Sequence, residues 1–247
     1  MGIKLLPPIE NFSWEKNISQ MFGVGAERYR RDFGIPAHNA LDIVIRDDKQ
    51  GFGSTVYSMH AGTVSSISYD VPHKTRGNSI TLLSEDRSFS TLYLHLSSFQ
   101  VNIEDHVRAF QPIATLGNSG KVYPAPSPAC PRCGSHVHAG LQIHGIQNEY
   151  RSFVDPTPYL WREGQKLPIK FTRNLFIGMS GDDISWLQTI LKIELEDKVT
   201  FEPIAYFGTQ TLQAVRLLQQ KYAISPSIGY VGIITRQFLM KKYSLYA

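Results

Sequence analysis

The stretch GSHVHAGLQI, residues 134–143, decides the fold of the first part of the chain. Side chains alternate between the two faces of a strand, so a strand here would direct His136 and His138 to one face and Val137 and Ala139 to the other. The stretch therefore predicts a strand with one core face and one chemical face. His144 would lie roughly 20 Å further along, too far to share a metal ion with His138. Taken alone, H-x-H is equally typical of two surface histidines on an edge strand.

The only two cysteines of the chain, Cys130 and Cys133, stand just before this strand. Together with His136 and His138 they could form a zinc knuckle, although the histidine spacing is shorter than in a zinc finger. A local disulfide, or a reduced pair that pins the loop, fits the spacing better. The sequence does not choose between these two states.

A better first half of a metal site lies upstream, where His38 and Asp42 form the pattern H-x-x-x-D. The β-branched residues after Asp42 favour a strand, on which His38 and Asp42 would be about 13 Å apart. Both can bind one ion only if the chain turns at Asn39 and Ala40. With His138 they complete two imidazoles and one carboxylate, the ligand set of a catalytic zinc with one position left for water. Such a water is a hydrolytic nucleophile at ordinary pH.

Amide hydrolysis also needs a group that transfers protons and a group that stabilises the oxyanion. His136 lies one strand repeat from His138, and His95 stands on another predicted strand, so either histidine could serve both purposes. A packed or surface imidazole is the simpler interpretation of His95 when it is taken alone. His60, His73 and His106 occupy turn-like contexts, and we assign them no role.

Short apolar segments separated by turn residues surround these motifs and predict an all-β sheet, sandwich or barrel. Residues 17–37 show little helical periodicity, and residues 121–133 hold three prolines and predict a long loop beside the H-x-H strand. The expected strands are the segment ending at residue 45, residues 55–59, 62–67, 78–83 and 90–96, and a pair within 101–116.

The pattern changes to helical spacing near residue 168. Asp182 begins a predicted helix with apolar residues at helical intervals, and two more helices are predicted after Gly208 and Gly232. These two helices open alike as G-x-x-T, 24 positions apart. The inner positions expected for the second helix are Leu212, Val215, Leu218 and Tyr222. A Pro- and Gly-bearing linker separates the two patterns, so we expect domains at residues 1–168 and 169–247.

The composition is that of a globular protein, with 42% hydrophobic and 19% charged residues over 247 positions. Residues 169–247 contribute +3 of the net charge of +4. This mild excess suits an anionic polymer and falls short of a nucleic-acid patch. No apolar run is long enough for a signal peptide or a membrane span. We therefore expect no nucleic-acid or membrane partner, and a monomer.

Three motifs in this order, His38-x-x-x-Asp42, the segment YLHLS around His95, and His136-x-His138, resemble the lysostaphin/LytM-type zinc metallopeptidases over roughly residues 15–160. The resemblance implies an α+β protein whose mainly antiparallel β domain carries an open groove. It implies one Zn²⁺ per chain held by His38, Asp42 and His138, with His95 and His136 as catalytic histidines. The implied reaction cleaves peptide bonds of bacterial peptidoglycan.

The sequence departs from the family pattern at Ala40, where a glycine is usual, and at Ala139 and Gly140, where an aromatic residue and a glutamate are common. The loop with Cys130 and Cys133 resembles an insertion. None of these departures removes a ligand. They bear on the shape of the groove and hence on which bond is cut.

The tail, roughly residues 174–244, is similar to the three-helix peptidoglycan-binding domain type 1, through the segments around Gly181, Gly208 and Gly232. This resemblance implies an anchor that holds the enzyme to bacterial peptidoglycan and raises the local concentration of scissile bonds. The combination is endolysin-like, and we expect the protein to act at the bacterial cell wall, as a phage-type lysin or as a mature secreted enzyme. The alternative is a non-enzymatic wall-binding or amidase-activating protein on the same scaffold. Degenerate proteins of that kind lack ligands, whereas this sequence keeps all of them.

Overall fold

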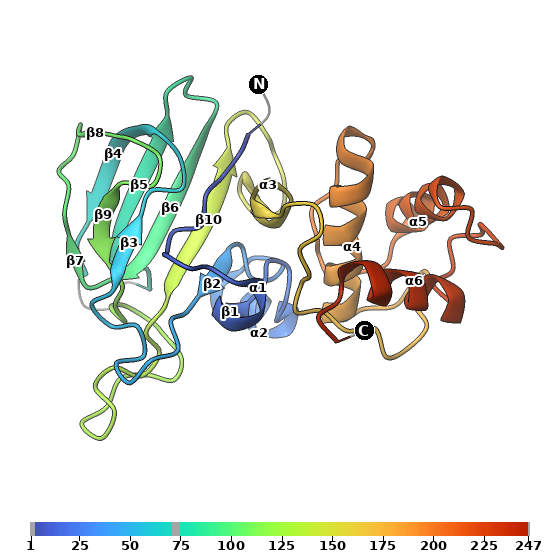
Figure 1. Cartoon of the computed structure of the whole chain (residues 1–247), viewed down its shortest axis with the longest axis horizontal. Helices are drawn as coiled ribbons and strands as arrows, with labels where there is room; N and C mark the ends of the chain where they lie inside the picture. Colours follow the sequence, from blue (N-terminus) through green and yellow to red (C-terminus); the bar gives the residue numbers. More distant parts are fainter. Residues whose placement is uncertain (1–2, 71–74, 247) are drawn as a thin grey trace. The chain divides into compact units, whose positions relative to one another are not determined.

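A computed structural model describes residues 3–70 and 75–246 of the chain (Figure 1). His73 lies outside the described residues. The chain divides into two compact units, one formed by Met1–Gln20 with Ala40–Leu160 and the other by Met21–Asn39 with Trp161–Ala247. The expected domain limits at residues 168 and 169 stay a prediction.

Two antiparallel sheets account for the strands described in the first unit. The larger has the order β1-β2-β10-β6-β5-β4-β8, with β11 paired to β10, and the smaller has the order β3-β9-β7. Strand β10 lies between β6 and β2, which places the H-x-H segment in the middle of the larger sheet (Figure 1). The mainly antiparallel β fold expected from the sequence is confirmed.

The bounds of these strands are β1 Ile18–Gln20, β2 Leu41–Ile43, β3 Thr55–Tyr57, β4 Gly62–Ser68, β5 Asn78–Ser84, β6 Phe89–Leu96, β7 Ser98–Phe99, β8 His106–Val107, β9 Pro112–Thr115, β10 Val137–Ile143 and β11 Phe153–Val154. The short helices α1 and α3 of this unit span Trp14–Asn17 and Thr157–Leu160.

Strand β10 shows why the sequence alternates as it does. Val137, Ala139 and Leu141 are fully buried, so the face expected to be core is core. On the other face, a Cβ added to Gly140 would come within 3.0 Å of Cε1 of Phe153, a residue of the neighbouring strand β11. A larger residue at position 140 would therefore have to displace the Phe153 ring.

Two local expectations differ from the structure. Residues 17–37 contain helix α2, Ala26–Phe33, which the sequence did not indicate because glycines at both ends, Gly25 and Gly34, hide a short amphipathic run. Within residues 101–116 only His106–Val107 and Pro112–Thr115 are strands, and they pair with different sheets rather than with each other.

The second unit contains α2 and the later helices α4 Asp182–Leu195, α5 Thr209–Lys221 and α6 Ile233–Tyr243, with a 3₁₀ turn η1 at Glu196–Lys198. Helix α4 begins one residue after Gly181 and buries Ile184, Leu187, Leu191 and Leu195 as expected. The expected inner face of α5 is confirmed in part: Val215 and Leu218 are buried, whereas Leu212 and Tyr222 are only half-buried. No helix in the described part of the chain combines the length and apolar character needed to cross a membrane.

The G-x-x-T repeat has a structural counterpart in two buried glutamines. Gln188 donates from Nε2 to the carbonyl of Tyr206 and to Oγ1 of Thr211, at 3.0 and 2.9 Å. One helix later, Gln219 makes the same pair of bonds to Tyr230 and Thr235, at 2.8 and 3.1 Å. Each threonine of the repeat thus joins the start of its own helix to the preceding helix.

Candidate metal centre

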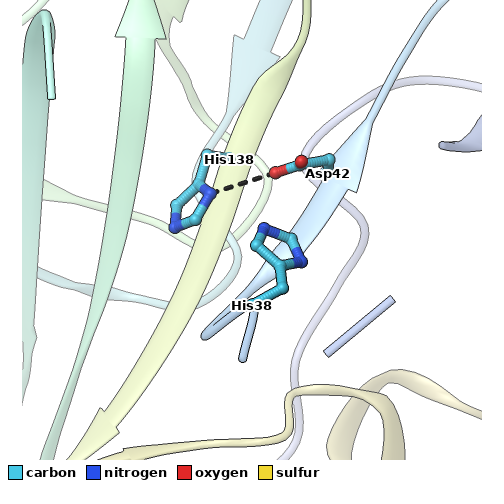
Figure 2. A group of neighbouring side chains, drawn as sticks. All are labelled: His38, Asp42 and His138. Atoms are coloured by element: carbon cyan, nitrogen blue, oxygen red, sulfur yellow. Dashed lines mark hydrogen bonds and ion pairs between the residues drawn. The ribbon is translucent and has the colours of Figure 1, made fainter. Parts of the chain in front are cut away.

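Three side chains from separate parts of the sequence meet at the chemical face of β10. One ligand atom each from His38, Asp42 and His138 lies within 4.8 Å of the other two (Figure 2). All three residues are buried, with 0%, 8% and 8% of their surface exposed. The upstream pair and the H-x-H strand are therefore brought together, as the sequence predicts.

Asp42 and His138 meet because their strands pair in register. In the antiparallel pair of β2 and β10, Asp42 is directly opposite His138. Their side chains contact at 3.0 Å between Oδ1 and Nδ1, the interaction drawn in Figure 2. The strand register thus positions the Asp42 carboxylate next to the His138 imidazole without the help of a metal ion.

His38 lies outside β2, in irregular backbone that the main chain holds in place. Its N–H donates to the carbonyl of Val24 at 3.0 Å, and its carbonyl accepts from the N–H of Gly23 at 2.8 Å. Its Nδ1 lies 3.0 Å from the carbonyl of Met21. A carbonyl can only accept, so Nδ1 carries the proton and Nε2 is left as the ligand atom.

His95 and His136 flank this group. The ring centroids of His95 and His136 are 4.7 Å apart, and those of His95 and His138 are 6.0 Å apart. Nε2 of His136 lies 3.6 Å from Oδ1 of Asp42. The structure thus gathers at one place all five residues that the sequence analysis selected.

Backbone carbonyls set the proton position in both flanking histidines. Nδ1 of His95 donates to the carbonyl of Ser119 at 2.8 Å, and Nδ1 of His136 donates to the carbonyl of Gly134 at 2.7 Å. When either ring is neutral, Nε2 is therefore the nitrogen without a proton. Residue His95 also has a positive φ of 64°, a conformation that residues other than glycine adopt rarely.

The electrostatic environment keeps His95 neutral. Burial lowers the pKa of His95, and the neighbouring His136 and His138 lower it further, to about 3. A neutral imidazole can accept a proton, whereas an imidazolium cannot.

The donor set fits zinc. Two imidazole nitrogens and one carboxylate oxygen, from His38, His138 and Asp42, are the protein ligands of many catalytic zinc sites. Burial adds to the fit, because an ion held there would be shielded from bulk water. The carbonyl of Met21 behind His38 is the kind of outer partner that orients a ligating imidazole.

The remaining described histidines lie elsewhere. His60 is buried and contacts Oγ1 of Thr91 at 2.9 Å, and burial lowers its pKa. His106 lies 3.1 Å from Oγ1 of Thr63. His144 contacts Oγ of Ser90 at 3.0 Å, in agreement with its expected separation from the metal group.

The cysteine pair is not part of the metal group. Cys130 and Cys133 form a disulfide, with their Cα atoms 5.3 Å apart. The zinc-knuckle interpretation is therefore wrong, because a cysteine binds zinc as a thiolate and the sulfurs of a disulfide are not thiolates. The disulfide that the spacing allowed is the form in the structure.

Sequence reasoning missed the main-chain groups that orient the histidines. The carbonyls of Met21, Ser119 and Gly134 carry no side-chain signature, so no residue pattern marks them. The turn of residues 117–120, with its sequence GNSG, was the available signal, because glycines there allow close backbone approach. A Cβ at Gly117 would lie 2.5 Å from the backbone nitrogen of Ser97.

Comparison with known proteins shows what part of the chain is similar to. Residues 37–150 match the model of peptidase family M23. The catalytic domain of lysostaphin from Staphylococcus simulans is 22% identical over 50% of this chain and 78% of its own, with a TM-score of 0.39. LytU is 22% identical over 61% of this chain and 88% of its own, with a TM-score of 0.45. A zinc-containing peptidase from Vibrio cholerae is 22% identical over 60% of this chain, which spans 37% of that protein, with a TM-score of 0.42.

Proposed function

We propose that the peptidase M23 domain within residues 37–150 is a zinc-dependent endopeptidase that hydrolyses peptide bonds of bacterial peptidoglycan. We further propose that residues 169–247 hold the enzyme to the wall. The observation that carries the first proposal is the buried group of His38, Asp42 and His138, with His95 and His136 beside it. The match to the family model supports the reaction class.

In this proposal, His38, Asp42 and His138 would hold one zinc ion. Bound there, zinc would supply a Lewis acid for amide hydrolysis. The pairing of β2 with β10 sets Asp42 against His138 before binding, so little reorganisation is needed. One such group among the described residues supports the proposal of one ion per chain.

His95 and His136 are proposed as the proton-transferring residues. In each, a backbone carbonyl holds the Nδ1 proton, so Nε2 is available to accept a proton and later to return it to the leaving amine. Nε2 of His136 lies 3.6 Å from Oδ1 of Asp42, one of the proposed ligands. Burial lowers the pKa of His95, so its ring is neutral at ordinary pH and Nε2 acts as a proton acceptor.

The wall anchor is supported by the sequence of the second unit. Residues 169–247 carry most of the net positive charge, and the G-x-x-T repeat resembles the peptidoglycan-binding domain type 1. We propose accordingly that the protein acts at the bacterial cell wall, as an endolysin-like or secreted wall hydrolase. A basic surface would draw the enzyme to anionic wall polymers.

The test is the release of new amino termini from purified walls by the full-length protein, with and without a chelator. Cleavage should require metal, return when zinc is added, and accompany about one zinc per chain. Equal digestion of walls by metal-free protein would overturn the proposal. Mass spectrometry of fragments from chemically distinct peptidoglycans would then identify the bond that is cut.

A further inference from the structure

The segment of residues 117–120 contacts His136, His95 and the cysteine loop. The carbonyl of Gly117 accepts from the N–H of His136 at 3.0 Å. The carbonyl of Ser119 accepts from Nδ1 of His95 at 2.8 Å. Between them, Asn118 donates from Nδ2 to the carbonyls of Pro131 and Cys133, both at 3.0 Å. The catalytic surroundings and the cysteine loop are thus tied to the same four residues.

The cysteine loop leads directly into the carbonyl that holds the His136 ring. The disulfide closes residues 130–133, and the N–H of Cys133 donates to the carbonyl of Cys130 at 3.2 Å. The next residue, Gly134, has a positive φ of 72°, and its carbonyl accepts from Nδ1 of His136 at 2.7 Å. A Cβ at Gly134 would lie 2.4 Å from the carbonyl oxygen of Pro124. The path of the backbone at Gly134 is therefore closely constrained.

We propose that the disulfide-closed turn of residues 130–133 and the Asn118 side chain are positioning elements for His136. Together they fix the direction of the Gly134 carbonyl, and through it the orientation of the His136 ring, with Nε2 toward Asp42. The inference rests on the proposed function, in which His136 transfers protons. It assigns a role to the cysteine loop that the ligand set alone does not explain.

Two features favour positioning over general stabilisation. A disulfide that closes so short a loop removes less freedom from the unfolded chain than one that closes a long loop. The Asn118 side chain donates both of its hydrogen bonds to carbonyls of this loop and not to the sheet. The disulfide and the Asn118 hydrogen bonds therefore stabilise the backbone mainly at Cys133, the residue before Gly134, whose carbonyl accepts from His136.

Two variants of the full-length, zinc-loaded protein test the proposal: Cys130→Ser with Cys133→Ser, and Asn118→Ala, which keeps the disulfide. The matched control is Asn102→Ala, an exposed asparagine in another loop of the same unit. We expect kcat to fall about tenfold or more in both test variants, with KM within about twofold and zinc content unchanged, as is usual for residues that orient a functional group. The control should behave as the wild type.

A second measurement does not depend on activity. Nitrogen NMR of the imidazole rings should show the Nδ1 proton of His136 protected by its hydrogen bond in the wild type and in the Asn102 variant, and exchanging faster in the two test variants. If the exchange of the His136 Nδ1 proton is unchanged in both test variants, the inference is wrong, whatever the rates of wall cleavage. A wild-type protein with the protected proton but no cleavage would instead contradict the proposed function alone.

Discussion

At the scale of single residues, His136, just before β10, and His138, within it, have different surroundings although they are only two positions apart. His138 contacts Asp42 through Nδ1, at 3.0 Å, whereas the Nδ1–H of His136 donates a hydrogen bond to the Gly134 carbonyl. The first arrangement suits a metal ligand and the second suits a proton carrier. Their side chains lie on the same face of the strand, so the difference comes from the partners and not from the pattern.

Substitution should separate these two roles. His138→Ala is expected to lose zinc and activity together, because one of three protein ligands is removed. His136→Ala is expected to keep zinc and lose at least about a hundredfold in kcat, the typical contribution of a general acid or base. Zinc quantification and rates on purified walls measure both effects.

His144→Ala is the matched control, because this exposed histidine follows the same strand but contacts Ser90 and not the metal group. It should keep both zinc and rate. Retention of zinc in His138→Ala with equal loss of activity in both site variants would contradict the division of roles.

At the scale of elements, the second unit depends on the bonds that join its helices. Gln219 on α5 is 1% exposed and satisfies the carbonyl of Tyr230, the hydroxyl of Thr235 and the N–H of Gly229. Gln188 on α4 occupies the equivalent place for the preceding turn, where it also accepts from the N–H of Ile204. Buried polar groups that lose their partners are costly, so these glutamines hold the starts of α5 and α6.

Gln219→Leu should lower the free energy of unfolding by at least about 2 kcal/mol, since buried groups of similar kind cost about 1–3 kcal/mol each when unsatisfied. Urea unfolding of the full-length protein measures this change. Gln213→Leu, at an exposed position of the same helix, should change stability by no more than about 0.5 kcal/mol. Equal effects of the two substitutions would show that the Gln219 bonds do not stabilise the unit.

At the scale of the whole molecule, wall binding and cleavage are predicted to be separable. Phe176 and Tyr230 of the second unit are 48% and 38% exposed, and their rings stack with centroids 6.1 Å apart. Exposed apolar side chains that gather in this way commonly mark a contact surface. We therefore expect them to contribute to retention on the wall.

Phe176→Ala with Tyr230→Ala, introduced into the inactive His136→Ala protein, should reduce sedimentation with insoluble walls several-fold. In the otherwise wild-type protein, the same pair should leave cleavage of a soluble peptidoglycan fragment unchanged. Tyr69→Ala, an exposed tyrosine of the first unit, controls for loss of surface aromatic area. Unchanged sedimentation of the double variant would exclude this surface as the anchor.

Much of the site could be predicted because metal ligands and proton carriers need particular side chains. Residue type and spacing selected His38, Asp42 and His138 as candidate ligands, whereas the resemblance to a known family was needed to select His95 and His136 as catalytic candidates. The alternation of β10 predicted which of its faces is core. Local periodicity likewise predicted the starts of α4, α5 and α6, while helix α2 escaped because it is short and bounded by glycines.

By itself, then, the sequence determined the candidate site residues and most of the strands and long helices, since both follow largely from local residue type. The tertiary structure alone decided that Asp42 stands opposite His138, that the cysteines bond to each other, and that the carbonyls of Met21, Ser119 and Gly134 orient three imidazoles. The physical reason is that strand register and carbonyl direction are properties of the folded backbone. Every residue has the same carbonyl, so only the fold determines which histidine it holds.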